Sequence, residues 1–194
     1  MKYYQIIIII TLVFSSSVYA TECYYVSKPT STTPFPELSS QGECGKLINQ
    51  DTFQLKKKHF NKLYFSNNDL AVFLYGNSIF YVSKSGKIAR THFIDNGPDY
   101  FNDGLARTIS KNKYGYIDEQ LNIVIKPEYD FVFPFENGKA IVCNNCVIES
   151  DGEHNVVVNG TWGVINTNGN IVVPLKYSKK ELRLSKEYKR ITKK

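Results

Sequence analysis

Four cysteines are the residues of this 194-residue sequence whose spacing suggests chemistry most directly. Cys143 and Cys146 form a Cys-x-x-Cys pair, whereas Cys23 and Cys44 lie far from it in the N-terminal quarter. Such a pair is redox-active when its first thiol lies at a helix N-terminus, and four cysteines can together hold zinc. Because strand-like residues flank the pair on both sides, the sequence instead predicts two disulfides, Cys143 with Cys146 and Cys23 with Cys44. The redox site and the zinc site stay open as alternatives.

The other residues of catalytic or metal-binding type are scattered along the chain. The histidines stand in different segments, without Cys, Asp or Glu at ligand spacing: His59, His92 and His154. Three aspartates recur at every fourth position, but without the alternating oxygens and distal glutamate of a calcium loop: Asp95, Asp99 and Asp103. Neither a nucleophile elbow nor a phosphate-binding glycine loop occurs. We therefore predict no catalytic residues, no metal and no cofactor, with surface or turn histidines and an ordinary aspartate loop rather than a weak cation site. Two facing carboxylates could still meet in the fold.

The first 20 residues have the pattern of an export signal. Lys2 precedes an apolar run at residues 6–14, and residues 18–20 end in Ala20, after which we expect cleavage. The run is shorter than the ~20 apolar residues that cross a bilayer. The sequence therefore predicts an exported protein, periplasmic or extracellular, that is not an integral membrane protein. This compartment also suits disulfides.

The composition favours β-structure in the elements that hold these residues. The chain has 18 Ile, 15 Val, 14 Tyr and 12 Phe but only 5 Ala, and branched and aromatic side chains suit a pleated surface. Short strands with turn residues between them are expected at 62–66, 70–75, 78–83 and 87–94. We also expect Asn144 and Asn145 to form a two-residue hairpin turn that sets Cys143 opposite Cys146.

From residue 79 to residue 177 the sequence repeats itself. A Phe-x-x-Gly-x-Ala pattern begins at Phe101 and again at Phe135. The segment 113–118 corresponds to 161–166, and each is followed by an Ile-Val run that leads to a proline, at 123–127 and 171–174. A weaker earlier copy begins near residue 79. The third copy is displaced by 14 extra residues, which places an inserted hairpin at about 143–159.

This pattern resembles the bacterial WG containing repeat, whose name-giving pair is present as Trp162 and Gly163. In the preceding copy Tyr114 replaces the tryptophan before Gly115. The resemblance implies an exported repeat protein without a common enzymatic activity. Together with the composition it indicates an all-β fold of antiparallel hairpins, stacked into a small solenoid- or propeller-like array. A short basic C-terminal tail is expected after the array from the charges alone.

Each repeat contributes aromatic rings and glycines to the expected site residues. The repeat-core aromatics are Trp162, Tyr114, Tyr116, Tyr129, Phe101 and Phe135. The repeat glycines are Gly104, Gly115, Gly138 and Gly163. We expect Asp118 and Asn166 to start turns by bonding their own backbone, and Pro127 and Pro174 to end strands.

The last segment of the chain concentrates positive charge. Residues 176–194 contain nine Lys or Arg and two Glu, whereas the whole chain carries a formal charge of +6. Leu184, Tyr188 and Ile191 have the spacing of a short amphipathic helix. Two interpretations stay open, a solvated tail and a segment attracted to an anionic envelope surface. Nucleic acid is not expected as a partner of an exported protein.

These observations predict the following organisation: a signal peptide at 1–20, a disulfide-closed lead-in at 21–60, a β-repeat domain at 61–178 and a basic tail at 179–194. Within the domain the repeats cover about 79–108, 113–142 and 161–177. A non-catalytic module that binds an unknown protein or envelope component is the favoured function. A cell-wall or glycan-active enzyme and a secreted effector or immunity component are the alternatives.

Overall fold

The computed structural model describes residues 22–192, apart from 36, 50, 95–96, 151 and 153–154. The expected export signal therefore lies outside the described residues. The strands are β1 (Cys23–Val26), β2 (Leu38–Ser40), β3 (Gly45–Leu47), β4 (Phe53–Leu55), β5 (Leu70–Tyr75), β6 (Ser78–Ser83), β7 (Ile88–Thr91), β8 (Phe93–Ile94), β9 (Gly97–Pro98), β10 (Leu105–Ser110), β11 (Lys113–Asp118), β12 (Ile123–Tyr129), β13 (Phe131–Val132), β14 (Lys139–Ser150), β15 (Asn155–Asn166) and β16 (Ile171–Tyr177). The helices are α1 (Lys57–Phe60), α2 (Lys179–Leu184) and α3 (Lys186–Thr192).

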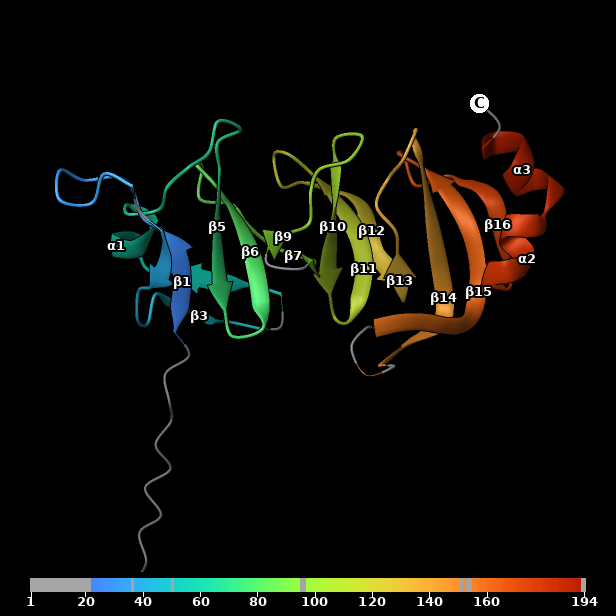
Figure 1. Cartoon of the computed structure of the whole chain (residues 1–194), viewed down its shortest axis with the longest axis horizontal. Helices are drawn as coiled ribbons and strands as arrows, with labels where there is room; N and C mark the ends of the chain where they lie inside the picture. The colour runs from blue at the N-terminus through green and yellow to red at the C-terminus, as the bar shows by residue number, and fades with distance from the viewer. Residues whose placement is uncertain are drawn as a thin grey trace, which may run out of the picture.

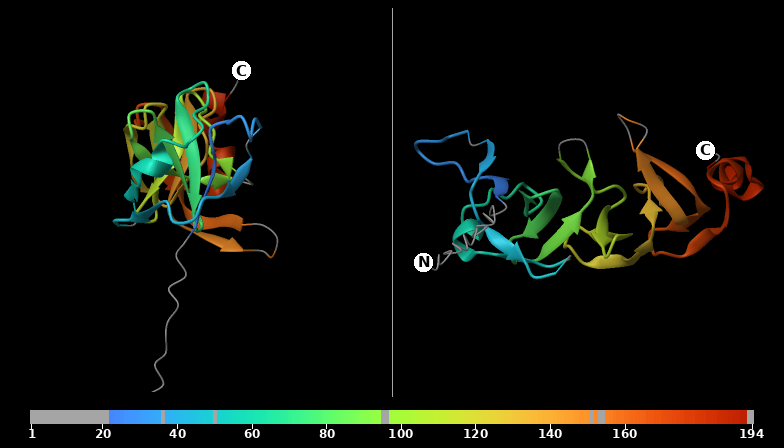
Figure 2. Two further views of the ribbon diagram at one scale, coloured as in Figure 1. Left: turned by 90° about the vertical axis from the view of Figure 1, so that its left-hand side faces the viewer. Right: turned by 90° about the horizontal axis from the view of Figure 1, so that it is seen from below.

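The all-β prediction is confirmed, because the described chain consists mostly of antiparallel strands. Eight strands form one sheet in the order β12-β11-β10-β7-β6-β5-β1-β2, and four form another in the order β13-β14-β15-β16. Figures 1 and 2 show these strands as successive groups along the longest axis of the molecule. The array is therefore an open row, as in a solenoid, rather than a closed ring.

Three meanders of three strands make up the row. They are β5-β6-β7, β10-β11-β12 and β14-β15-β16, which we call the first, second and third units. The first two strands of each unit pair in the same register, with a buried alanine opposite a buried branched residue: Ala71 with Val82, Ala106 with Ile117 and Ala140 with Ile165. The small side chain leaves room for its larger partner, which is why the Phe-x-x-Gly-x-Ala pattern keeps its alanine.

The core is divided into successive clusters along the row. One lies under the N-terminal strands around Phe73 and Phe80, and another joins the first and second units around Tyr81 and Ile117. A third joins the second and third units, and a fourth lies between the third unit and the C-terminal helices. Each unit thus buries its apolar surface against a neighbour, as stacked repeats require.

Both ends of the row are covered. At the N-terminal end, β1 extends the first unit by pairing with β5, and the Cys23–Cys44 disulfide ties β1 to the segment before β3. Residues 62–66 do not form the expected strand, since only Leu63 bridges to Ser27 in this stretch.

At the C-terminal end, α2 and α3 pack on the third unit, so the described part of the basic tail is folded. Leu182 is 1% exposed and is the apolar anchor of α2, whereas Leu184 is 60% exposed. The expected helix with Leu184 on its apolar face is therefore wrong. The reason is Ser185, which is in the extended conformation and divides the segment into two helices.

Candidate functional site

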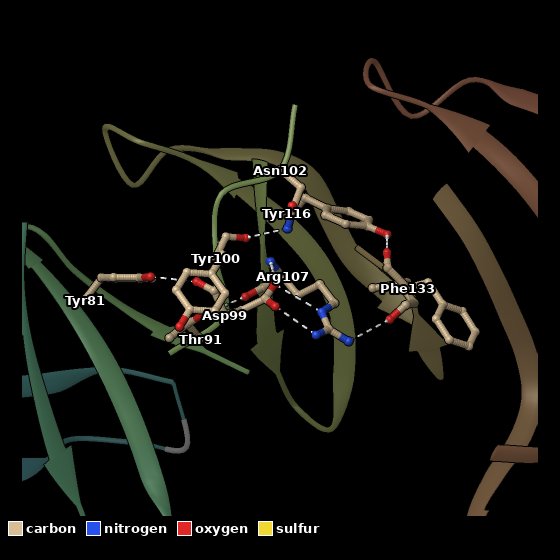
Figure 3. A network of polar contacts seen from close by, with 9 residues as sticks. Tyr81, Thr91, Asp99, Tyr100, Asn102, Arg107, Tyr116 and Phe133 are labelled. Atoms are coloured by element: carbon tan, nitrogen blue, oxygen red, sulfur yellow. Dashed lines mark hydrogen bonds and ion pairs between the residues drawn. The ribbon is translucent and has the colours of Figure 1, made fainter. Parts of the chain in front are cut away.

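The most densely bonded polar cluster lies between the first and second units (Figure 3). Arg107 on β10 donates hydrogen bonds to the Asp99 carboxylate from two side-chain nitrogens: Nη2 lies 2.8 Å from Oδ1, and Nε lies 3.1 Å from Oδ2. The Arg107 backbone N–H donates a further hydrogen bond to Oδ2 at 2.7 Å. Only 5% of the Arg107 side chain and 2% of the Asp99 side chain are exposed. This is a buried, bidentate ion pair.

Neighbouring strands complete the cluster. The Tyr81 hydroxyl on β6 donates to the Asp99 carbonyl at 2.6 Å, and the Thr91 hydroxyl on β7 donates to the Arg107 carbonyl at 2.9 Å. Arg107 Nη1 donates to the carbonyl of Val132 on β13 at 3.3 Å. Figure 3 shows the guanidinium reaching from the Asp99 side toward this strand. The cluster therefore links the first and second units to the strand that leads into the third.

The arrangement leaves little scope for catalysis. The Asp99 oxygens already accept three N–H donors, and solvent does not reach them, so the carboxylate has no exposed lone pair for a substrate. Asp103 is also engaged, because its Oδ2 accepts the Gly138 N–H at 2.7 Å. Asp95 lies outside the described residues. Within the described ranges, no group of three or more His, Cys, Asp or Glu is placed to hold a metal ion.

The histidines differ from the surface positions expected for them. His59 is 5% exposed, and its Nδ1 lies 2.8 Å from the Tyr25 hydroxyl, so the surface prediction is wrong there. His92 is half-buried beside Tyr114. Burial, with the nearby Arg107 charge, lowers the pKa of His92 to about 4, which keeps the ring neutral near pH 7. His154 lies outside the described residues.

The repeat glycines Gly115 and Gly163 lie where a neighbouring backbone comes unusually close. A Cβ at Gly115 would lie 2.3 Å from the Ile125 carbonyl oxygen, and a Cβ at Gly163 would lie 2.6 Å from that of Val173. In the second and third units the third strand shifts its register opposite the glycine, so that it bulges toward the middle strand. In the first unit Phe80 stands at this position, and β6 pairs with β7 without a shift.

Glycine is needed for a different reason at the other two repeat positions. Gly104 and Gly138 have φ of +78° and +74°, and a Cβ at either would meet nothing within 4 Å. They follow Asp103 and Asn137, which also have positive φ. Each pair forms a turn directly before the first strand of the second or the third unit. These positions therefore need the left-handed backbone conformation rather than space.

Proline in the third strand does not end it. Pro127 lies inside β12 and Pro174 inside β16, so the expected strand ends at these residues are wrong. Each proline falls in the bulged stretch, between the register partners Ile125 and Tyr129 in β12. The regular ladder is already interrupted there, and proline is tolerated within strands at bulges.

The expected turns at Asp118 and Asn166 are confirmed. Asp118 Oδ1 accepts the N–H groups of Gln120 and Asn122, at 3.0 and 2.7 Å. Asn166 Oδ1 accepts the two corresponding N–H groups of the third unit, at 3.1 and 2.9 Å. The same side-chain oxygen thus closes the turn before the third strand in both units.

Sequence comparison matches two segments, which begin in the middle strands of the second and third units, to one family model. Residues 114–145 and 162–179 match the family model of the WG containing repeat. The match begins at Tyr114 and resumes at Trp162, the two residues that precede the bulge-facing glycines. The first unit lies outside the matched ranges, as its regular β6–β7 pairing would suggest. No curated protein and no solved structure matches the chain.

The aromatic residues of the WG containing repeat lie mostly in the core. Trp162 and Tyr116 are fully buried, and most of the other rings singled out from the sequence are 3–8% exposed: Phe135, Tyr129 and Tyr114. Phe101 is half-buried and packs on Tyr81. The Trp162 indole N–H donates to the Asn159 carbonyl at 2.7 Å. These rings fill the array and offer no open stacking platform.

Both disulfides are present, but the expected turn between Cys143 and Cys146 is wrong. The two cysteines lie within the single strand β14, opposite Trp162 and Asn159 of β15. The positive φ of Asn145, +57°, marks a local irregularity rather than a chain reversal. The hairpin continues to Ser150 and Asn155 before it turns. Asparagine adopts the left-handed conformation within a paired strand as well as in a turn, and the sequence did not distinguish the two.

A groove lies between the third unit and the C-terminal helices. Its volume is about 860 Å³. Apolar walls come from the second-to-third connection, from the third unit and from α3: Phe133, Pro134, Phe135, Ile141, Val164, Tyr188 and Ile191. The rim is polar: Asn102, Glu136, Asn137, Lys139, Arg183 and Thr192. The sequence reasoning missed this groove because it treated residues 179–194 as a tail.

The helices that close this groove are held in place by local contacts. The Ser178 side chain and Glu181 form a capping box at the start of α2. Lys179 Nζ lies 5.2 Å from the Phe133 ring centre and 5.1 Å from the Trp162 ring centre. Burial lowers the pKa of Lys179, and the nearby Arg183 adds to the effect. These contacts pack α2 directly against the third unit and the segment before it, beside the groove.

The charged residues at the rim indicate whether the groove is suited to hydrolysis or to binding. Glu136 is the only carboxylate among the lining residues, whereas Lys139 and Arg183 are cationic. Glycoside hydrolysis ordinarily needs two carboxylates flanking the bond, and this lining supplies one. An apolar floor with polar groups at its edge is instead typical of a binding site.

Proposed function

We propose that the protein is an exported, non-catalytic binding module that holds a segment of a partner protein in the groove between the third unit and the C-terminal helices. The groove itself carries this proposal: it combines an apolar floor of about 860 Å³ with a polar rim. The WG containing repeats support a repeat-type binding module, because stacked repeats provide extended surfaces.

Charge at the rim indicates the kind of segment. Lys139 and Arg183 outnumber Glu136, so a peptide with apolar side chains and at least one acidic group fits best. The side-chain amides of Asn102 and Asn137 offer donors and acceptors suited to a peptide backbone. Export rests on the signal pattern at residues 1–20 and on the two disulfides.

A photo-crosslinking experiment tests the groove. A benzophenone amino acid replaces Tyr188, which lines the groove, and in a matched control it replaces Tyr24, a 43% exposed residue of β1 at the other end of the row. We expect a specific adduct from position 188 alone. The partner segment, identified from the adduct and synthesised, should bind the purified protein and lose about tenfold in affinity in Arg183→Glu. Equal adducts from both positions, or unchanged binding in Arg183→Glu, would contradict the proposal.

A further inference from the structure

A second pocket is lined in part by Phe60, the last residue of α1, and Figure 1 shows α1 at the opposite end of the row from α2 and α3. Its volume is about 640 Å³, and its lining residues are Lys28, Pro29, Phe60, Tyr64, Phe65 and Lys84. Backbone hydrogen bonds hold its two main segments together: the Lys28 N–H donates to the Lys62 carbonyl at 2.8 Å, and the Tyr64 N–H donates to the Val26 carbonyl at 2.9 Å. The pocket is therefore built on fixed backbone.

The aromatic side chains form an open cage. Phe60 and Phe65 meet edge to face with their ring centres 5.7 Å apart, and both are half-buried. Tyr64 is 47% exposed, although Leu63 beside it is fully buried and anchors the segment. Three rings thus face a space large enough for a small organic ligand. Phe60 and Phe65 also pack against the N-terminal core cluster, but they remain only half-buried, whereas Trp162 and Tyr116 of the repeats are fully buried.

The charges at this pocket are of one sign. None of the six lining residues is acidic, and two are lysines. Lys84 forms an ion pair with Asp69 at 2.5 Å, whereas Lys28 forms no ion pair with any residue that the structure describes. Lys62, which is exposed, is hydrogen-bonded to Lys28 through the backbone and adds positive charge nearby. An apolar molecule with an anionic group satisfies both the cage and the Lys28 ammonium.

We propose that this pocket binds a free amphiphilic small molecule, with its apolar body against Phe60, Tyr64 and Phe65 and its anionic group at Lys28. The anionic group is a carboxylate, a sulfonate or a phosphate, which share the charge and the acceptor oxygens that a lysine recognises. The volume suits one ligand molecule of ordinary size. This site shares no residue with the groove at the C-terminal helices, so either can exist without the other.

Two fluorescent probes with the same ring system test the proposal. 8-Anilinonaphthalene-1-sulfonate carries an anionic group, and N-phenyl-1-naphthylamine lacks it. We expect one saturable site for the sulfonate, with about fivefold tighter binding than for the neutral probe. Lys28→Gln should remove this preference and leave the neutral probe unaffected, while Tyr64→Ser should weaken both probes.

Matched controls separate this site from others. Lys46→Gln removes an exposed lysine of β3 outside the pocket, and Tyr188→Ala alters the other groove, so neither should change sulfonate binding. Circular dichroism of each variant checks that it is folded. Equal affinity for the two probes, or sulfonate binding that survives Lys28→Gln, would overturn the proposal.

A vesicle experiment distinguishes the free ligand from a lipid surface. The full protein is centrifuged with vesicles of phosphatidylcholine containing anionic phosphatidylglycerol. Protein that stays in the supernatant supports a free ligand. Protein that pellets with the vesicles, and is released by Lys28→Gln, would overturn the free-ligand proposal in favour of a membrane surface.

Discussion

Replacing Gly115 with alanine should unfold the array at markedly lower denaturant concentration. The added Cβ would lie 2.3 Å from the Ile125 carbonyl oxygen and 2.6 Å from the Pro127 nitrogen, whereas ordinary contact begins at 3.4 Å. The overlap of about 1.1 Å involves backbone atoms, which cannot rotate away as a side chain does. Overpacking typically costs ~1–3 kcal/mol, and we place Gly115→Ala at about 3 kcal/mol because the bulge itself must move.

Urea unfolding measures this cost. Trp162 is the only tryptophan, and it is buried in the third unit, so its fluorescence follows unfolding while circular dichroism follows the strands. For a chain of this size, 3 kcal/mol corresponds to a decrease in Tm of about 6–12 °C. Gly97→Ala is the control, since a Cβ at Gly97 would meet nothing within 4 Å and its φ is not in the left-handed region.

The loss of unfolding free energy in Gly115→Ala, compared with that in Gly97→Ala, shows whether the close backbone is the cause. If Gly115→Ala stays within about 0.5 kcal/mol of the parent protein, the glycine is not required by the bulge and the packing explanation is wrong. A loss in Gly97→Ala as large as that in Gly115→Ala would show that added side-chain bulk, rather than the close backbone, is responsible.

Three further changes test other parts of the fold. Trp162→Ala should cost ~3–5 kcal/mol of unfolding free energy, measured by circular dichroism in urea, because the ring is fully buried; a change below about 1 kcal/mol would contradict this. Asp99→Ala should cost ~3–5 kcal/mol in the same assay, because it leaves the buried Arg107 charge unpaired, and Asp99→Ala with Arg107→Leu should recover part of the loss. The pKa of His92 is about 4 in the folded protein and near 6.5 when unfolded, so the unfolded state binds more protons between these values and stability should fall as the pH drops through them. Discounted for partial exposure, the decrease is about 1–2 kcal/mol, and His92→Gln should reduce it; an identical pH profile in this variant would refute the assignment.

Local patterns in the sequence were sufficient to predict the regular parts of the units. The predicted strands at 70–75 and 78–83 coincide with β5 and β6, because short runs of branched and aromatic residues on either side of a Gly-Asn turn define a hairpin. The turn aspartate and asparagine were also predictable, since each bonds only its own segment. Asn144 and Asn145 misled because asparagine with a positive φ occurs both in two-residue turns and, as at Asn145, inside a paired strand.

The junctions and grooves depend on contacts that a single sequence does not display. Arg107 stands in a strand of otherwise small or apolar buried residues, and that lone charge was the signal that sequence reasoning passed over. Its partner Asp99 was grouped with two other aspartates by spacing alone. Likewise, Leu182 rather than Leu184 anchors α2, because the position of the helix break at Ser185 decides which leucine faces the third unit.

Because the core is divided into successive clusters along the row, binding at one end of the molecule can affect the other end only through the units between them. The N-terminal pocket and the C-terminal groove share no lining residue, and the second unit is the only repeat between the units that bear them. Any thermodynamic coupling between ligands at the two ends must pass through that unit and its junctions. The Arg107 guanidinium, which contacts both Asp99 and the strand leading to the third unit, lies on this route. A rigid junction of this kind would make the two ends bind independently, so that stabilisation by two ligands would be additive.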